Sequence, residues 1–356
     1  MIPITSSSIY SPLKIVHHQD MLARMRDGIP SPPLFVQLIP TNRCPARCSF
    51  CAYRTTGYSS SQSFDETDEI AWPKLKEMVG DFSSIGVKAC ELTGGGEPTV
   101  HPCFSDLCNA LVDAGIDVGI VTNGMGCSKH LDAIRRAKWI RFSIDAGCAA
   151  TYATTRHVPY DTYERVRDVI RELRSSRDGQ DPVIGVGFVV HNGNWSEIMN
   201  AAVNAKSDGA DNFRISAVFQ DRGVDYFRMF YADAKELCRD ARQLQDNTFR
   251  VFDLFGDRID DLAVGRPTFP ECHFQKLCTY IAADLNVYRC CVVANNPVGL
   301  LGSIENRPFS SMWCSDSVQE KLTSFSPSAC PHCMTTAKNA TIDYCLKNNP
   351  PHVNFI

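Results

Sequence analysis

The chain has 356 residues and a formal net charge of −4, with 44% hydrophobic and 21% charged residues, which are ordinary values for a globular protein. That length suits one large α/β barrel or two domains, and the mild negative charge lacks the basic footprint of a nucleic-acid-binding protein. The N-terminal residues show no basic start followed by an apolar core, and no apolar run is long enough to cross a bilayer, so neither a secretory signal nor a membrane span is predicted.

Short apolar runs alternate with longer amphipathic segments from residue 33 to about 220. The segment 161–174 predicts a helix, because Tyr163, Val166 and Ile170 recur at helical spacing and Asp161 can cap its start. Strands buried on both faces and separated by helices indicate a parallel sheet, and six such units predict a partial (β/α)6 TIM-like barrel. The predicted strands are 33–40, 88–95, 117–124, 139–146, 182–190 and 212–219.

The densest basic run, residues 135–141, covers an expected helix end and the start of the next strand. Cations in the last turn of a helix interact favourably with the helix dipole. We therefore interpret this run as structural and not as a phosphate site.

The chain contains 17 cysteines. Without a secretory signal we expect a cytoplasmic protein, whose thiols stay reduced, so this number favours metal or cluster ligation over disulfides. Cys44, Cys48 and Cys51 lie on a polar loop after the first predicted strand, residues 94–98 (GGGEP) follow the second, and Asn123 follows the third. Because the loops after parallel barrel strands converge on one mouth, these segments are expected to form one site.

Three thiols on one loop suit an iron-sulfur cubane better than zinc. Zinc prefers four tetrahedral ligands, usually as two close pairs, whereas a four-iron cluster held by three thiolates keeps one iron open to another ligand. Buried packing thiols are the alternative, but a loop rich in Pro, Arg and Ser makes a poor core.

The spacing Cys44-x3-Cys48-x2-Cys51, with the aromatic Phe50 before the third cysteine, resembles the CxxxCxΦC signature of the radical S-adenosylmethionine (SAM) superfamily. Other segments agree in order: GGGEP resembles the GGE motif of that family, Ser143 and Asp145 stand where its strands end around SAM, and residues 185–194 resemble its later adenine-side strand. The resemblance covers residues 33 to 220. The residues it implies as cofactor contacts are Phe50, Gly94, Gly95, Gly96, Glu97, Asn123, Ser143, Asp145, Arg156 and Val189.

The resemblance implies that the open iron binds SAM, that one electron cleaves its sulfonium bond, and that the 5′-deoxyadenosyl radical removes a hydrogen atom from a substrate. The glycines would allow close approach to a small polar ligand, and Glu97 can accept hydrogen bonds from an ammonium group. Structural alternatives stay open at this stage: GGGEP and Asn123-Gly124 could be plain turns, Asp145 a helix cap and Ser143 a sheet residue.

A second series of cysteines begins at residue 272. Residues 281–290 (IAADLNVYRC) resemble the SPASM and twitch extensions of some radical SAM enzymes, but Leu285 occupies the usual glycine position and Arg289 replaces a proline, which puts the hairpin turn in doubt. The resemblance implies one auxiliary [4Fe–4S] cluster, and a zinc ribbon is the alternative. The expected ligands are Cys272, Cys290, Cys330 and Cys333, with Cys278, Cys291 and Cys345 as alternates. We interpret the other cysteines as packing residues: Cys90, Cys103, Cys108, Cys127, Cys148, Cys238 and Cys314.

The expected domain order is an N-terminal extension (1–32), a radical SAM barrel (33–225), a bridging segment (226–269) and an auxiliary-cluster domain (270–356). A fully ligated auxiliary cluster favours accepting an electron from a substrate radical, which predicts an oxidoreductase. The expected electron donor is of the flavodoxin or ferredoxin type.

Peptide-maturing members of the resembled family frequently carry a separate leader-binding domain before the barrel, and the segment before the first strand is short here. We therefore expect a small polar metabolite (a sugar, cyclitol or nucleoside) as substrate. The alternatives are a peptide maturase or epimerase and, in other classes, a zinc-stabilised binding module or an iron-sulfur electron carrier. The candidate substrate contacts at strand ends are Arg156, His157, His191, Asn192, Asn194, Arg214, Ser216 and Gln220.

Overall fold

One ten-stranded sheet runs through the protein in the order β10-β9-β8-β1-β2-β3-β4-β5-β6-β7. The computed structural model describes residues 9–55, 61–219, 222–348, 351 and 354. The strands are β1 Phe35–Leu38, β2 Ala89–Leu92, β3 Asp117–Thr122, β4 Trp139–Ser143, β5 Val183–Val190, β6 Asn212–Ala217, β7 Arg250–Leu254, β8 Cys278–Ile281, β9 Asn286–Tyr288 and β10 Leu300–Ser303.

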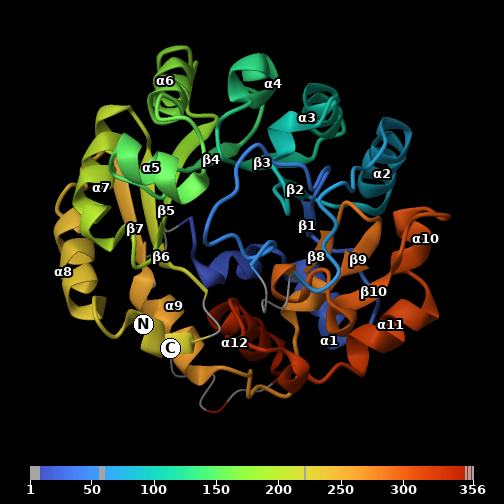
Figure 1. The fold of residues 1–356 in the computed structure, drawn as a ribbon. Helices are drawn as coiled ribbons and strands as arrows, with labels where there is room; N and C mark the ends of the chain where they lie inside the picture. The colour runs from blue at the N-terminus through green and yellow to red at the C-terminus, as the bar shows by residue number, and fades with distance from the viewer. Residues whose placement is uncertain (1–8, 56–60, 220–221, 349–350, 352–353, 355–356) are drawn as a thin grey trace.

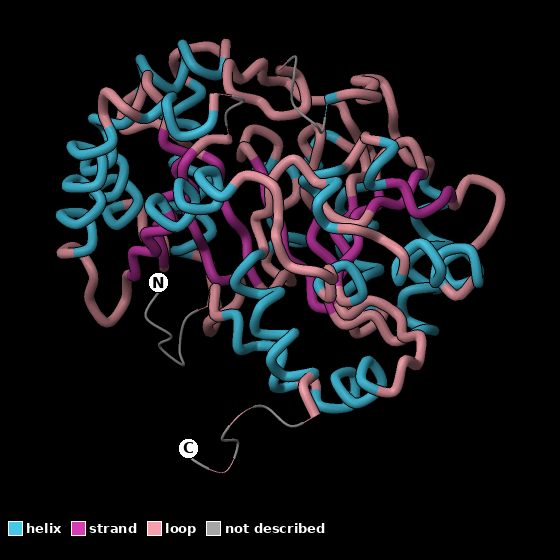
Figure 2. The backbone as a smooth tube through the Cα atoms, turned by 90° about the horizontal axis from the view of Figure 1, so that it is seen from below, coloured by secondary structure: helices cyan, strands magenta, loops and turns pink. Residues whose placement is uncertain are grey.

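Helices cover the outer face of the curved sheet (Figure 1). Seen from below, the strands are surrounded by helices and loops (Figure 2). The α-helices are α1 Gln19–Arg26, α2 Trp72–Ile85, α3 Phe104–Asp113, α4 Leu131–Ile134, α5 Ala149–Arg156, α6 Thr162–Ser175, α7 Ile198–Ser207, α8 Tyr231–Arg242, α9 Phe255–Val264, α10 Phe309–Trp313, α11 Asp316–Thr323 and α12 Thr336–Leu346.

All neighbours from β8 through β1 to β7 are parallel, so the predicted partial barrel is confirmed. Each of the six predicted strands is present. The helix predicted at 161–174 is α6, and Asp161 occupies its N-cap position, although its side chain makes no capping hydrogen bond and pairs with Arg165 instead.

Two strands of the parallel sheet were not expected. β7 lies in the segment predicted to bridge two domains, where its polar residues Arg250 and Asp253 weaken the apolar pattern. β8 lies in the cysteine-rich region, and it pairs with β1 from Phe35↔Cys278 onward. The sheet thus continues past the predicted boundaries at 225 and 270, and the division into domains stays a prediction.

The sheet does not close, because β7 and β8 stand at opposite ends of the parallel array and do not pair. α9 and α12 lie across this open side in Figure 1, where the C-terminal part of the chain meets the barrel. α12 also contacts α1 and the 3-10 helix Pro12–His17. The open side therefore brings residues after 255 close to the interior of the barrel.

The hairpin between β8 and β9 forms despite Leu285. This residue adopts φ 63°, the left-handed conformation that a glycine would accept at lower cost. Leu285 also packs against the main hydrophobic core, which compensates for part of that cost. The neighbouring Arg289 donates to Gln275 at 2.5 Å and lies over the Phe325 ring at 4.0 Å.

None of the helices in the described ranges combines the length and the apolar character needed to span a membrane.

Candidate active site

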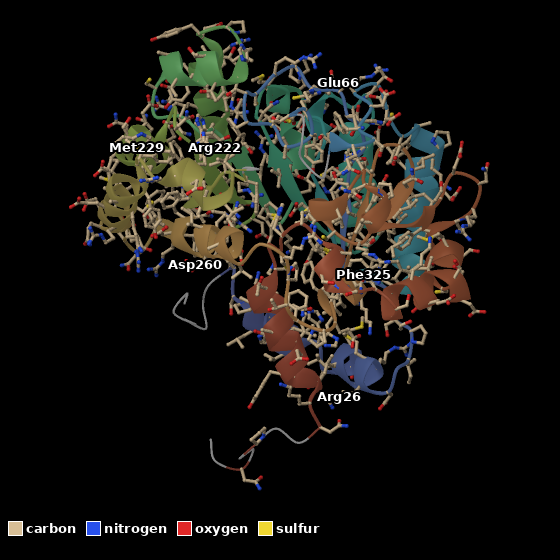
Figure 3. All side chains as sticks on the ribbon, turned by 60° about the horizontal axis from the view of Figure 1, so that its bottom comes forward. Arg26, Glu66, Arg222, Met229, Asp260 and Phe325 are labelled. Atoms are coloured by element: carbon tan, nitrogen blue, oxygen red, sulfur yellow. The ribbon has the colours of Figure 1, made fainter. Side chains whose placement is uncertain are left out.

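The loop that carries Cys44, Cys48 and Cys51 follows β1 and is tied to the end of α5. Arg47 N donates to the Arg156 carbonyl and Ser49 N to the Thr155 carbonyl, each at 2.9 Å. On the outer side of the loop, Glu66, which is labelled in Figure 3, pairs with Arg47 and Arg54. These contacts fix the loop at the carboxyl ends of the strands.

The glycine segment after β2 packs directly on the start of the cysteine loop. A Cβ atom at Gly96 would lie 2.3 Å from the Arg43 carbonyl oxygen, and one at Gly95 would lie 2.6 Å from Asn42 Oδ1. Glu97 N donates to the Arg43 carbonyl at 2.8 Å. Glycine is therefore required here for packing between two loops, in addition to any approach of a ligand.

A cavity of about 250 Å³ lies where these loops meet. The three cysteines line it, as do all ten residues that the sequence predicted as cofactor contacts. Sequence reasoning did not single out Ala46, Ala52, Tyr53, Arg54, Thr93, Val121 and Thr122, which complete the lining. Val121 could have been found from the strand alternation, since it shares a face with Asn123.

Glu97 is buried, with 2% of its surface exposed, and it connects the ends of β2 and β3. Its Oε1 accepts from the Thr122 hydroxyl at 2.6 Å and from Thr99, while Oε2 accepts from Asn123 N at 2.6 Å. Burial raises the pKa of Glu97, and these hydrogen bonds oppose the rise. A carboxylate offers about four acceptor positions, so a position on Oε2 remains for a ligand that donates from the cavity.

Asp145 and Arg156 form a buried ion pair at 2.5 Å, with side chains 3% and 4% exposed. Asp145 has φ 55° and also accepts from Val189 N at 2.7 Å, so it joins the ends of β4 and β5. It does not cap α5, whose N-cap is Cys148, and that alternative was wrong. Burial raises the pKa of Asp145, and the Arg156 charge opposes the rise.

Protein groups donate hydrogen bonds to two of the three loop sulfurs. Arg156 Nη1 lies 3.4 Å from Cys48 Sγ, and Asn123 Nδ2 lies 3.7 Å from Cys44 Sγ. Burial raises the pKa of Cys48 to about 11 and that of Cys44 as well, and the nearby thiols add to the rise. The raised pKa values mean that the buried thiolates are unfavourable without a positive charge nearby, and a cationic cluster core would supply that charge. The three sulfurs at this cavity therefore fit a cluster.

His191, directly after β5, stacks on Phe50 with ring centroids 4.9 Å apart. Its Nδ1 accepts from Gly193 N at 3.1 Å, and its Nε2 is buried without a partner within the described residues. Burial, followed by the Arg156 charge, lowers the pKa of His191 to about 4. The ring is therefore neutral, with the Nε2 proton available.

The other candidate substrate contacts are not gathered at the cavity. Asn194 is structural, since Nδ2 donates to the Asp145 and Val189 carbonyls at 2.9 Å. Asn192 pairs with the Tyr226 hydroxyl, and His157 is exposed at the end of α5. Ser216 is buried on β6. Arg214 faces the barrel interior and is treated below, and Gln220 lies outside the described residues.

The four predicted auxiliary ligands lie together near the open side of the barrel. Burial raises the pKa of Cys272 to about 12, and the thiols of Cys290, Cys333 and Cys330 raise it further. Burial likewise raises the pKa of Cys330 to about 12, with Cys290 and Cys333 adding to the rise. Of the alternates, Cys345 packs in a small apolar cluster with Ile15 and Ile342.

The alternative to a cluster at the C-terminal cysteines is a zinc ribbon. In the described ranges, no three His, Cys, Asp or Glu side chains are arranged to hold one metal ion. Tetrahedral zinc needs sulfurs at about 2.3 Å from the metal. The zinc ribbon stays the alternative to a cluster here.

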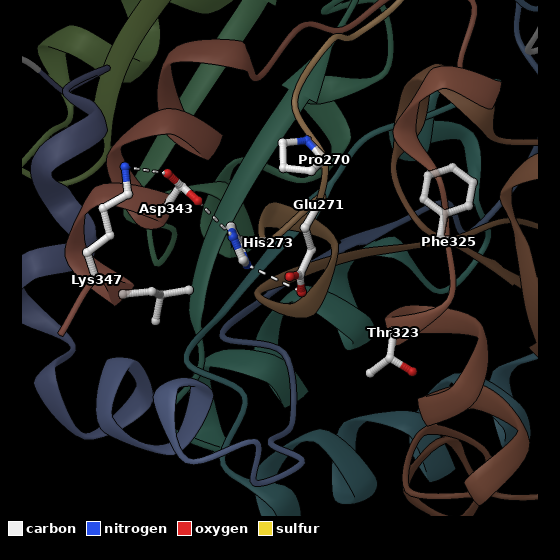
Figure 4. A pocket seen from close by; sticks show the side chains of 8 residues that line it. Pro270, Glu271, His273, Thr323, Phe325, Asp343 and Lys347 are labelled. Atoms are coloured by element: carbon white, nitrogen blue, oxygen red, sulfur yellow. Dashed lines mark ion pairs between the residues drawn. The ribbon is translucent and has the colours of Figure 1, made fainter.

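A second cavity, of about 360 Å³, lies next to Cys272 and contains no cysteine (Figure 4). His273 in its wall lies 3.5 Å from Glu271 and 3.4 Å from Asp343, and Asp343 also pairs with Lys347. The cavity is larger than the one at the loop thiols, and its carboxylates already have cationic partners, since Glu271 pairs with Lys276 and Asp343 with Lys347.

Most of the remaining cysteines are packing residues, as predicted. Cys90, Cys108, Cys127 and Cys238 are buried and Cys103 is partly buried. Cys148 and Cys314 are exposed, so the prediction was wrong for these two. Both sit beside a helix terminus on the surface, where the sequence pattern alone does not separate exposed from buried positions.

Comparison with protein families finds that residues 38–203 match the model of the Radical SAM superfamily. Among curated proteins, the GTP 3′,8-cyclase of Staphylococcus haemolyticus (strain JCSC1435) is 28% identical over 173 residues, which are 48% of this chain and 48% of that protein. The chain thus matches about half the length of this relative. The GTP 3′,8-cyclase of Staphylococcus aureus (strain JH9) is 25% identical over 130 residues, 35% of this chain and 38% of its own.

Among solved structures, Streptococcus suis SuiB bound to S-adenosylmethionine has a TM-score of 0.64 at 14% identity, covering 90% of this chain and 75% of that one. The protein anSMEcpe with bound AdoMet has a TM-score of 0.58 at 15% identity, covering 81% and 83%. At these identities the likeness shows a shared fold.

Proposed function

The chain carries a radical SAM domain at residues 38–203, and from that premise we propose that it cleaves SAM reductively and removes a hydrogen atom from a bound substrate. The cofactors of this superfamily are a [4Fe–4S] cluster and SAM. The observation that carries the proposal is that one cavity is lined by all three loop cysteines and by the four strand-end segments expected around SAM.

Cys44, Cys48 and Cys51 would hold the cluster, and the glycine segment with Glu97 would receive the amino group of SAM. The bound cluster and SAM would together supply the one-electron reduction and the hydrogen abstraction typical of the superfamily. Arg156 and Asn123 donate toward the sulfurs, and such hydrogen bonds tune a cluster's potential. Burial of the cavity walls limits access of water to a reactive species.

For the C-terminal region we propose one auxiliary [4Fe–4S] cluster on Cys272, Cys290, Cys330 and Cys333, in a SPASM- or twitch-type domain. These thiols lie close enough to raise one another's pKa, which supports the assignment, and so does the shared fold with SuiB. Ligation by four thiolates leaves no open iron, which favours an electron-accepting role. The leading reaction is therefore an oxidation or dehydrogenation of a small polar metabolite such as a sugar, cyclitol or nucleoside.

A peptide substrate is the second candidate. SuiB has been solved bound to the precursor peptide SuiA, and anSMEcpe with the Kp18Cys peptide. Those two proteins share the fold of this chain, which supports modification of a peptide as the alternative. The cytoplasmic location and a flavodoxin- or ferredoxin-type electron donor are further parts of the proposal, carried by the sequence.

The test is anaerobic purification followed by iron and sulfide analysis and a SAM-cleavage assay with dithionite. We expect 5′-deoxyadenosine to form, and we expect added SAM to change the electron paramagnetic resonance spectrum of the reduced cluster. Zinc without sulfide, and no 5′-deoxyadenosine, would contradict the proposal. Parallel incubations with metabolite mixtures and with peptide libraries then separate the two substrate classes by SAM-dependent mass changes.

A further inference from the structure

Two arginines face the interior of the barrel beside the cavity. Arg141 lies on β4, two residues before Ser143, and residues two apart share a face of a strand. Ser143 lines the cavity, so Arg141 lies on the same inner face, one layer deeper. Arg214 lies on β6. Its charge lowers the pKa of Asp145 at the cavity wall, and so does the charge of Arg141.

The strand between these two arginines presents no side chain at their level. Gly187 on β5 pairs with Arg214 in register, and a Cβ atom at Gly187 would lie 3.5 Å from Arg141 Cδ. Val189, two residues further on the same face, lines the cavity. The glycine leaves room for the stem of Arg141, which lies across β5 on this inner face.

Neither guanidinium has an anionic partner among the residues that the structure describes. Arg214 Nε is buried without a hydrogen-bond partner. The interactions found for these groups are with aromatic rings: Arg214 lies over Tyr10 at 5.4 Å and Arg141 over Trp139 at 5.8 Å. By contrast, the guanidinium of Arg156 is paired with Asp145 at 2.5 Å.

The local charge is positive and poorly compensated. Burial lowers the pKa of Arg214 to about 10, and the charges of Arg141 and Arg258 lower it further, so the group stays cationic at neutral pH. Glu91 on β2, which accepts from Gln37 at 3.0 Å, opposes this effect. The other carboxylate that both arginines act on, Asp145, is paired with Arg156. Like charges brought together away from water are costly unless an anion joins them.

Arg141 differs in this respect from the rest of the basic run 135–141. Arg135 pairs with Asp132 at 2.6 Å, Arg136 with Asp113 at 2.5 Å and Lys138 with Asp181 at 3.0 Å, all at the surface. These three cations fit the structural interpretation of the run. Arg141 is the member of the run that the strand turns inward.

We propose that Arg141 and Arg214 bind an oxyanion group of the substrate, a carboxylate or a phosphate, beside Gly187, over which the Arg141 side chain lies. The inference rests on the proposed function, because it places the substrate beside the cavity assigned to SAM. A guanidinium presents its donors as a planar fork that matches carboxylate and phosphate oxygens. The substrate of this enzyme is then anionic, and the arginine pair orients it toward the cavity.

The test uses the cluster-loaded full chain under anaerobic conditions and measures binding of two probes, inorganic phosphate and succinate, by calorimetry. We expect the wild type to bind at least one of them, and the probe that binds more tightly identifies the anion class. Arg141→Gln and Arg214→Gln should each weaken that binding at least about tenfold, the size of one lost charge-assisted hydrogen bond. Arg136→Gln, which removes a surface cation of the same run, should bind as the wild type does.

Thermal unfolding provides a readout that a structural role would not give. Arg214→Met removes an unpaired buried charge, so its ligand-free Tm should equal or exceed the wild-type value, while the Tm increase caused by the bound probe should disappear. Binding of neither probe to the wild type, or wild-type binding by Arg141→Gln, would overturn the proposal. Should Arg214 variants fail to fold, Arg141→Gln alone decides.

Formation of 5′-deoxyadenosine by the wild type is measured on the same preparations. Its absence would contradict the proposed function and leave the anion result standing. Its presence without any anion binding would contradict only the inference drawn here.

Discussion

Arg156 connects the Cys48 sulfur to the Asp145 carboxylate, with Nη1 at 3.4 Å from Sγ and Nη2 paired with the carboxylate. Nη2 also donates to the Ser143 carbonyl at 2.6 Å. One side chain from the end of α5 therefore joins the cysteine loop to the carboxyl ends of β4 and β5. The geometry of the loop depends on this buried pair.

Replacement of Arg156 by Met should destabilise the protein by about 3 to 5 kcal/mol, because it leaves the Asp145 charge buried without a partner. The double variant Arg156→Met/Asp145→Asn removes both charges, keeps an oxygen that can accept from Val189 N and suits φ 55°, so it should recover most of that loss. Anaerobic denaturant titration measures both. A double variant as unstable as the single one would show that the ion pair is not the cause.

The same substitution should make the potential of the bound cluster more negative, because a positive donor to one cluster sulfur is lost. Arg156→Lys, which keeps the charge, should lie between the wild type and Arg156→Met. A redox titration followed by electron paramagnetic resonance measures the potential. Equal potentials in all three proteins would exclude an influence of Arg156 on the cluster.

The loop cysteines should be individually essential for SAM cleavage. Cys44→Ala, Cys48→Ala and Cys51→Ala each remove one of the three sulfurs that line the cavity, so 5′-deoxyadenosine formation with dithionite should fall to background. Cys238→Ala is the matched control, because that thiol is buried in α8 away from the cavity. Retained cleavage in the three loop variants would refute the assignment.

Much of the barrel could be predicted because its strands read as short apolar runs separated by amphipathic helices. The site followed from topology, since the loops after β1, β2 and β3 meet at one edge, and Cys44, Glu97 and Asn123 line one cavity. The sequence could not show which side chains of the site pair with one another. Nothing in the spacing indicates that Asp145 pairs with Arg156, because that contact depends on the left-handed backbone at Asp145.

The C-terminal half was harder to predict. β7 and β8 are short, and they form strands because they pair with β6 and β1. Tertiary contacts, and not the local sequence pattern, therefore determine these two strands. Leu285 shows the same effect: the hairpin forms with a leucine at φ 63°, since packing of its side chain offsets a backbone cost that sequence rules would count against the turn.

Loss of an auxiliary ligand should lower the iron content without abolishing the first half of the reaction. Cys272→Ala and Cys330→Ala should each reduce iron from about eight to about four per chain, the content of one cubane. Turnover should stop, while SAM cleavage without substrate persists. Cys345→Ala is the control, because Cys345 packs in an apolar cluster and should leave the iron content unchanged. Iron loss in Cys345→Ala but not in Cys272→Ala would require a different ligand set.

His191 should make the protein less stable in acid. Its pKa is lowered from 6.5 to about 4 by burial and by the Arg156 charge, so as the pH falls below 6.5 the unfolded chain takes up a proton that the folded chain refuses. The resulting loss should be about 1 kcal/mol at pH 5.5 and should approach roughly 3 kcal/mol near pH 4, where the folded state also protonates. Burial also lowers the pKa of His332, which adds the same pH dependence to every variant.

His191→Phe keeps a ring to stack on Phe50 but cannot titrate. Its stability should therefore fall less steeply than that of the wild type when urea unfolding is measured between pH 7.5 and 5.5. Parallel pH profiles for the two proteins would show that His191 is not buried in its neutral form.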